Sequence, residues 1–117
     1  MTALELALYL ESFRYDSGSE AALQDGVAQS LEKAGLSFER EVELAPGDRI
    51  DFLAGAVGVE VKLTGGLSEV TRQLHRYAKS ERIQELLLVT NSVRLARVPE
   101  ALQGKPIHVA ALLGGIV

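Results

Sequence analysis

The chain has 117 residues, of which 47% are hydrophobic, and a formal net charge of −4, which suits one domain with one core. The acidic balance excludes a surface that is basic throughout, so a polyanionic partner would need a local basic patch or bridging metal ions. The chain has no cysteine for disulfides, no apolar run near the ~20 residues of a membrane span and no basic signal-peptide start, so we expect a cytoplasmic soluble protein.

The first predicted element is a short helix within the segment MTALELALYLESF. Its expected apolar side follows helical spacing through Leu4, Ala7, Leu8 and Glu11. The segment RYDSGS follows as a linker, so we expect residues 1–16 to form an N-terminal helical arm and residues 17–117 a single domain. The arm can dock on its own core or on a second copy of the chain, and both alternatives are open.

A longer helix is predicted in SEAALQDGVAQSLEKAGLSF, where Leu23, Val27 and Leu31 form one stripe and Gly35 follows the last turn. A strand follows in LSFEREVEL, and the turn APGD ends it. The stretch RIDFLAGAVGVEVKL, residues 49–63, predicts a β-hairpin around the two-residue loop Gly55-Ala56.

The remaining segments predict a helix and two buried strands. Ser68 can cap a helix that runs to about Arg82. The run ELLLVTN is typical of a strand buried on both faces, VPEALQG of a short helical turn, and PIHVAALLG of a closing strand. The resulting order, α-α-β-β-β-α-β-(α)-β, predicts an α/β fold in which helices flank a mixed sheet.

Alternation along the hairpin is expected to separate an apolar from a charged side. The apolar side would comprise Ile50, Phe52, Val59 and Val61, and the charged side Asp51, Glu60 and Lys62. The loop places Asp51 directly across from Glu60, with Cβ atoms about 5 Å apart, where two carboxylates repel unless a positive charge lies between them. Mg²⁺ satisfies that need, whereas a solvated strand face that collects both signs of charge is the alternative.

Two helices can support such a site. Glu20 shares the core-facing stripe of its helix, where it can reach a metal ion or complete a capping box with Ser17. In SEVTRQLHRYAKSER, Gln73 borders the apolar stripe and Tyr77 lies one turn further on. A basic stripe on the same helix consists of Arg72, Arg76 and Lys79. Such a stripe is either a solvated outer face or a contact for a phosphodiester backbone.

Together these residues resemble the PD-(D/E)xK nuclease superfamily, which has the restriction-endonuclease-like fold. The match comprises Glu20, Asp51, Glu60-Val61-Lys62 and Gln73-Leu74-His75-Arg76-Tyr77. The Gln-x-x-x-Tyr element resembles that of the RecB-like branch. In this chain Ile50 replaces the Pro that names the motif, and no helicase or ATP-binding Gly-rich loop accompanies it, which leaves the substrate open.

The resemblance implies a Mg²⁺-dependent nuclease that hydrolyses DNA, with Mn²⁺ as a substitute metal. By resemblance, Glu20, Asp51 and Glu60 bind the metal and Lys62 serves in catalysis. Gln73 would assist the site and Tyr77 would orient it or contact substrate. The expected nucleic-acid contacts are Arg49, Arg72, Arg76 and Lys79.

Small members of this superfamily include junction resolvases, which act as dimers, so a homodimer is also expected. One alternative is a catalytically inactive nuclease-fold module that binds DNA or a partner protein. The other is a structural interaction domain whose N-terminal helix swaps between subunits.

Overall fold

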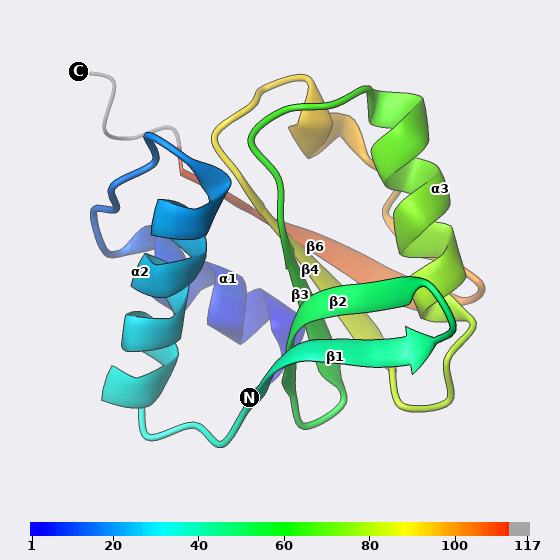
Figure 1. Ribbon diagram of the computed structural model, residues 1–117, viewed down its shortest axis with the longest axis horizontal. Coiled ribbons are helices and arrows are strands. Elements are labelled where there is room, and N and C mark those ends of the chain that lie inside the picture. Colours follow the sequence, from blue (N-terminus) through cyan, green and yellow to red (C-terminus); the bar gives the residue numbers. More distant parts are fainter. Residues whose placement is uncertain (113–117) are drawn as a thin grey trace.

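A six-stranded mixed sheet runs through the centre of the protein, in the strand order β1-β2-β3-β4-β6-β5 (Figure 1). The computed structural model describes residues 1–112. The helices are α1 (Ala3–Glu11), α2 (Glu20–Lys33) and α3 (Leu67–Ala78), with a short 3-10 helix η1 (Leu95–Arg97). The strands are β1 (Glu39–Ala45), β2 (Asp48–Ala54), β3 (Val57–Val61), β4 (Glu85–Thr90), β5 (Ala101–Leu102) and β6 (Lys105–Ala111).

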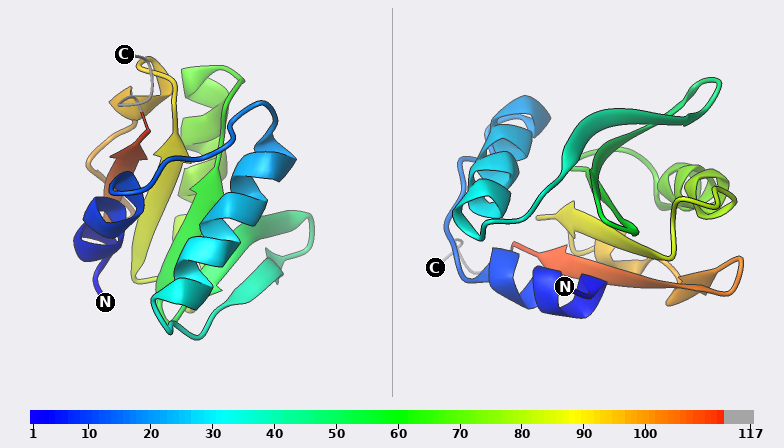
Figure 2. Two further views of the ribbon diagram at one scale, coloured as in Figure 1. Left: turned by 90° about the vertical axis from the view of Figure 1, so that its left-hand side faces the viewer. Right: turned by 90° about the horizontal axis from the view of Figure 1, so that it is seen from below.

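The central strands β3, β4 and β6 are parallel to one another, whereas β1, β2 and β5 pair with their neighbours antiparallel. Helices α1 and α2 cover one face of the sheet and α3 covers the other (Figure 2). The predicted α/β fold with a mixed sheet flanked by helices is therefore confirmed. None of the helices within residues 1–112 combines the length and apolar character that a membrane crossing requires.

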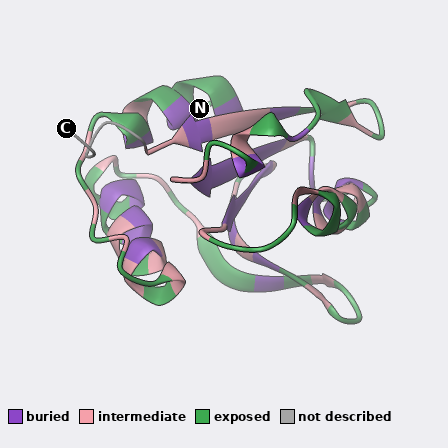
Figure 3. Cartoon of the chain, turned by 90° about the horizontal axis from the view of Figure 1, so that it is seen from above, coloured by how far each residue is buried: buried purple, intermediate pink, exposed green. Residues whose placement is uncertain are grey.

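Strand β4 shows why the sheet needs cover on both faces. Leu87 and Val89 pack against α1 and α2, whereas Leu86 and Leu88 pack against α3. All four side chains are fully buried, as the continuous apolar run predicted. Figure 3 shows the buried residues along the central strands and on the helix surfaces turned toward them.

Helix α1 docks on the sheet of its own chain, the first of the two alternatives for this segment. Its buried side consists of Ala3, Leu6, Ala7 and Leu10. The predicted apolar side was wrong for Leu4 and Leu8, which are 51% and 61% exposed. Leucine at every second position offers a helix two apolar sides, and only packing against the sheet selects one of them.

Helix α2 matches its prediction, because Leu23, Val27 and Leu31 are fully buried and Gly35 ends the helix with a φ of +72°. Helix α3 differs at both ends. It follows Gly66, which makes no side-chain cap, so Ser68 lies inside the first turn. It ends at Ala78 rather than Arg82, because the backbone amides of the next residues bond to carbonyls only three residues back.

The prediction of a helical turn in VPEALQG was wrong. The short helix η1 ends before Pro99, and Ala101–Leu102 instead forms β5, which pairs with Lys105 and Pro106. Gln103 and Gly104 make the turn between them with φ values of +54° and +72°, as a tight hairpin requires. The closing strand is confirmed as β6, although residues 113 and 114 of its predicted range lie outside the described residues.

Candidate active site

Strands β2 and β3 separate next to two carboxylates. Their backbone pairing runs from Ala54↔Val57 to Phe52↔Val59, as the Gly55-Ala56 loop predicted. Beyond Phe52, hydrogen bonds to side chains replace the backbone hydrogen bonds between the two strands. The amide of Asp51 donates to Glu60 Oε1 (3.1 Å), and the amide of Val61 donates to Asp51 Oδ2 (2.8 Å). The structure thus brings Asp51 and Glu60 together, as the hairpin register predicted.

The separation of the strands also changes which side chains share a face. Ile50 and Phe52 were expected on one apolar side, and that expectation was wrong. Ile50 packs in the cluster beneath α3, whereas Phe52 packs with Phe38 in the cluster beneath α1 and α2. The side-chain alternation of β2 is therefore interrupted between Ile50 and Phe52, at Asp51, whose amide bonds to Glu60 instead of a strand carbonyl.

Tyr77 connects α3 to this pair. Its hydroxyl is shared between the carbonyl oxygen of Arg49 (2.7 Å) and Glu60 Oε2 (3.2 Å), and it accepts a hydrogen bond from Gln73 Nε2 (2.8 Å). Tyr77 is fully buried, and its hydroxyl is surrounded by these three hydrogen-bond partners. The i, i+4 spacing of Gln73 and Tyr77 on one helix makes their contact possible. Both therefore help to position Glu60.

Lys62 supplies positive charge next to the pair. It follows Glu60 by two residues, directly after the end of β3, and its Nζ lies 3.7 Å from Glu60 Oε2. Its side chain is 24% exposed, so the ammonium group lies between the buried carboxylate and solvent. This ion pair offsets part of the cost of burying Glu60.

Burial is the largest influence on the pKa values of the two carboxyl groups. Burial, together with the charge of Asp51, raises the pKa of Glu60 to about 8, against the opposing effect of Lys62. Burial also raises the pKa of Asp51, with a smaller contribution from the charge of Glu20. Burial and the adjacent Glu60 raise the pKa of Tyr77, which therefore remains a neutral hydroxyl. At neutral pH the carboxyl pair consequently retains a proton unless another cation neutralises it.

Glu20 is tied to the end of β3 instead of capping its own helix. Ser19 is the N-cap, and its Oγ accepts a hydrogen bond from the amide of Ala22 (3.0 Å), so the capping-box alternative with Ser17 is wrong. Glu20 Oε1 accepts a hydrogen bond from the amide of Leu63 (3.0 Å). The Glu20 carboxylate therefore lies at the carboxyl end of β3, next to the segment that follows Lys62.

The three acidic residues do not form a ready three-ligand site. Among residues 1–112, no group of three or more His, Cys, Asp or Glu side chains is arranged to hold a metal ion. Asp51 and Glu60 bring two carboxylates together, whereas the Glu20 carboxylate accepts its hydrogen bond from the Leu63 amide. The chemistry of this pair fits Mg²⁺, which usually keeps several waters and binds one or two carboxylates plus substrate phosphates.

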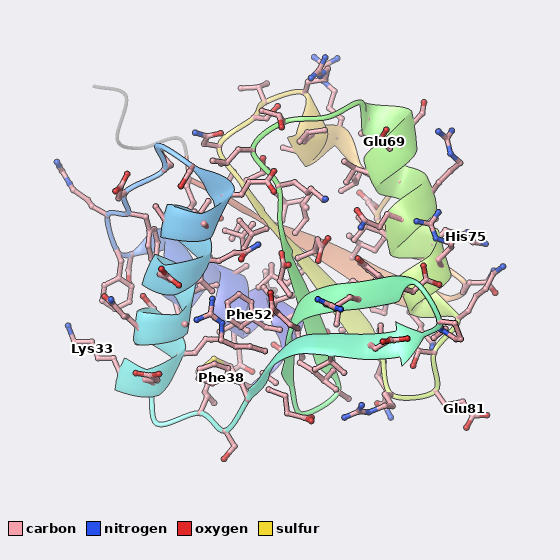
Figure 4. The ribbon with its side chains drawn as sticks, in the orientation of Figure 1. Lys33, Phe38, Phe52, Glu69, His75 and Glu81 are labelled. Carbon is pink, nitrogen blue, oxygen red and sulfur yellow. The ribbon has the colours of Figure 1, made fainter. Side chains whose placement is uncertain are left out.

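The predicted basic residues lie at the surface of the protein, on β2 and along α3. Arg49, Arg72 and Lys79 are exposed, whereas the Nε of Arg76 bonds to Asp48 Oδ1 at 3.0 Å. The side-chain view shows charged groups projecting outward from α3, with His75 near its middle (Figure 4). Part of the charge of the basic stripe is thus neutralised within the protein itself.

Sequence reasoning missed the groups that hold the acidic side chains in place. These are the backbone amides of Asp51, Val61 and Leu63. Every residue except proline carries such an amide, so no residue type marks these positions in the sequence. No protein-family model, curated protein or solved structure matches the chain.

Proposed function

We propose that the protein is a metal-dependent nuclease that hydrolyses phosphodiester bonds of DNA. The observation that carries the proposal is the buried Asp51–Glu60 pair with the Lys62 ammonium 3.7 Å from Glu60. A fold gains no stability from two adjacent carboxylates whose charged forms are disfavoured by burial. Perturbed carboxyl groups of this kind are concentrated in catalytic sites.

A divalent metal would be held by the carboxylates of Asp51 and Glu60. When bound, Mg²⁺ or Mn²⁺ supplies Lewis-acid polarisation of the phosphate and a more acidic water. Within residues 1–112, every buried side-chain polar atom has a hydrogen-bond partner, and the two carboxylates are among them. Their hydrogen bonds hold them in position before any metal binds. Glu20 would contribute negative charge beside the end of β3, where the Leu63 amide holds its carboxylate.

The other groups of the site have distinct roles in this proposal. Lys62 reaches solvent next to Glu60, so its ammonium can orient a water molecule and balance negative charge that develops on a phosphate. Tyr77 and Gln73 are positioning residues, because Tyr77 contacts Glu60 from α3 and Gln73 contacts Tyr77. The proposal also draws on the resemblance of the motif residues to the PD-(D/E)xK superfamily, in which such residues form the active site.

Cleavage and metal-binding assays on the same protein test the proposal. Purified protein with Mg²⁺ or Mn²⁺ should cut at least one member of a panel of linear, nicked, flapped and four-way DNA. Glu60→Gln, Asp51→Asn and Lys62→Ala should each lower the rate by about 100-fold or more, on the order of the loss of one essential catalytic group. Glu81→Gln is the matched control, because Glu81 is exposed and projects outward beyond α3 (Figure 4).

Isothermal titration separates this proposal from a catalytically inactive DNA-binding module. Mn²⁺ should bind the wild-type chain and the Glu81→Gln variant, and should fail to bind Glu60→Gln. Absence of cleavage for the whole panel, together with absence of Mn²⁺ binding, would sink the nuclease proposal. Tight DNA binding under those conditions would favour the inactive module instead.

A further inference from the structure

The loop that follows β4, residues 91–97, lies at the end of the sheet where the carboxyl ends of β3 and β4 are found. The two strands are parallel and adjacent, so their carboxyl ends emerge side by side. Arg94 Nη2 donates a hydrogen bond to the carbonyl oxygen of Gly65 (3.0 Å) and so joins this loop to the segment after Lys62. Figure 1 shows the two loops next to each other, beside the start of α3.

The charge of this loop is positive and is not neutralised by ion pairs. No acidic residue occurs between Glu85 and Glu100. Arg94 and Arg97 are exposed, and neither forms a salt bridge in the part of the chain that the structure describes. Two acidic residues lie near the adjoining segment: Glu69, in the first turn of α3, is close to Gly65, and Glu20 accepts a hydrogen bond from the Leu63 amide.

The loop is also held in a defined conformation. Leu95 is fully buried in the cluster beneath α3, and its amide donates to Ser92 Oγ at 3.2 Å. The amide of Ser92 donates in turn to Thr90 Oγ1 at 3.0 Å. Val93 at the tip is 62% exposed, so the loop projects into solvent from a buried anchor. A loop ordered in advance loses less conformational entropy when it binds a ligand.

We infer that residues 91–97 form a DNA-binding loop in which Arg94 and Arg97 contact backbone phosphates next to the active site. The inference rests on the proposed nuclease function and extends its substrate contacts beyond α3. The bond to Gly65 uses one of the five N–H donors of the Arg94 guanidinium, so the others remain available for phosphate oxygens. Arg76 is the weaker candidate, because Asp48 already pairs with it.

A double variant, Arg94→Gln with Arg97→Gln, tests the inference. Fluorescence anisotropy with a labelled DNA duplex of about 20 base pairs in EDTA measures binding to phosphates without metal bridging. We expect affinity to fall about fivefold or more at ~50 mM salt, and the slope of log affinity against log salt to decrease by about 1 for each arginine that no longer binds a phosphate. The control is Lys33→Gln, which removes one positive charge at the far end of α2 (Figure 4).

The outcomes distinguish this inference from the proposed function. If the wild-type protein cuts DNA and the double variant keeps both its affinity and its salt dependence, the loop does not bind DNA, although the nuclease proposal stands. An equal fall in affinity for Lys33→Gln would also overturn the inference, because the effect would then reflect net charge alone. If the wild-type chain binds no DNA in EDTA at low salt, the inference is overturned too.

Discussion

The backbone amide of Asp51 donates a hydrogen bond to the carboxylate of Glu60 on the neighbouring strand, 3.1 Å away. A side chain thus occupies the position at which a strand carbonyl would continue the ladder between β2 and β3. The reciprocal bond from the Val61 amide to Asp51 fixes the second carboxylate in the same way. The two strands therefore separate around a pair of acidic groups, whose burial has consequences for stability, metal binding and pH dependence.

The first prediction concerns stability and pH. The pKa of Glu60 is about 8 in the folded protein, above the value of an exposed carboxyl group, so the folded chain binds this proton more tightly than the unfolded chain. The contribution of Glu60 is therefore most favourable at low pH and is lost as the pH rises from about 5 to about 8. Glu60→Gln should remove this loss and raise the free energy of unfolding near pH 8 by roughly 1–3 kcal/mol.

Urea denaturation of both proteins at several pH values measures this effect. The two curves of unfolding free energy against pH should converge near about pH 5 and separate as the pH rises. Glu81→Gln should follow the wild type throughout, because Glu81 is exposed. A Glu60→Gln variant that is less stable than wild type at about pH 8 would contradict the burial argument.

The second prediction links metal binding to the loss of the proton from the Glu60 carboxyl group. Because a carboxylate must lose its proton to bind a metal, Mn²⁺ affinity should rise between about pH 6 and pH 8, by at most about tenfold per pH unit for one proton. Titration calorimetry in two buffers with different ionisation enthalpies measures the protons released. Affinity that does not change with pH would show that Glu60 is not a ligand.

The third prediction concerns the hydroxyl of Tyr77. Tyr77→Phe should cost roughly 1–2 kcal/mol in urea denaturation, because the part-buried Arg49 carbonyl and Gln73 amide lose a hydrogen-bond partner. It should also raise the pKa of Glu60 further, since the hydroxyl bond favours the charged carboxylate. Tyr9→Phe is the matched control, because its hydroxyl donates to the Ser30 carbonyl (2.7 Å) instead of a carboxylate. That control should lose stability without any change in its pH dependence.

The fourth prediction concerns the close packing at Gly58 in β3. A Cβ at this position would lie 2.6 Å from the Cδ1 atoms of both Ile50 and Ile83. Gly58→Ala should therefore destabilise the protein by roughly 1–3 kcal/mol, as overpacking of a core does. The cost should be smaller in an Ile83→Val background, which removes one of the two clashing methyl groups. Thermal denaturation of the four proteins in this double-mutant cycle measures the coupling.

The fifth prediction tests the face of α1 that packs on the sheet. Leu6 is 1% exposed and Leu8 is 61% exposed. Leu6→Ala should cost roughly 2–4 kcal/mol, whereas Leu8→Ala should change the free energy of unfolding by less than about 0.5 kcal/mol. Urea denaturation distinguishes the two. A large drop in stability for Leu8→Ala would indicate that a further surface covers this side of the helix in solution.

Much of the fold could be predicted from the sequence because its signals are local. The turn at Gly55-Ala56 set the hairpin register, and this register alone placed Asp51 opposite Glu60. The apolar run of β4 and the stripe of α2 likewise identified their elements. The prediction failed at residues 99–104, where a pattern suited to a helical turn forms a two-residue strand because β6 offers it a partner.

Apart from β5, the order of the elements follows from local patterns in the sequence, and so does the chemistry available to the site: two adjacent carboxylates, a lysine two residues after the second, and an i, i+4 pair of amide and phenol. Packing of the whole chain selects the buried side of α1, brings Glu20 to the Leu63 amide and brings Arg94 to the Gly65 carbonyl. The two hydrogen bonds join residues distant in sequence through backbone groups that almost every residue carries. Residue spacing therefore contains no signal for them, and they follow only when the packed sheet brings its strand ends together.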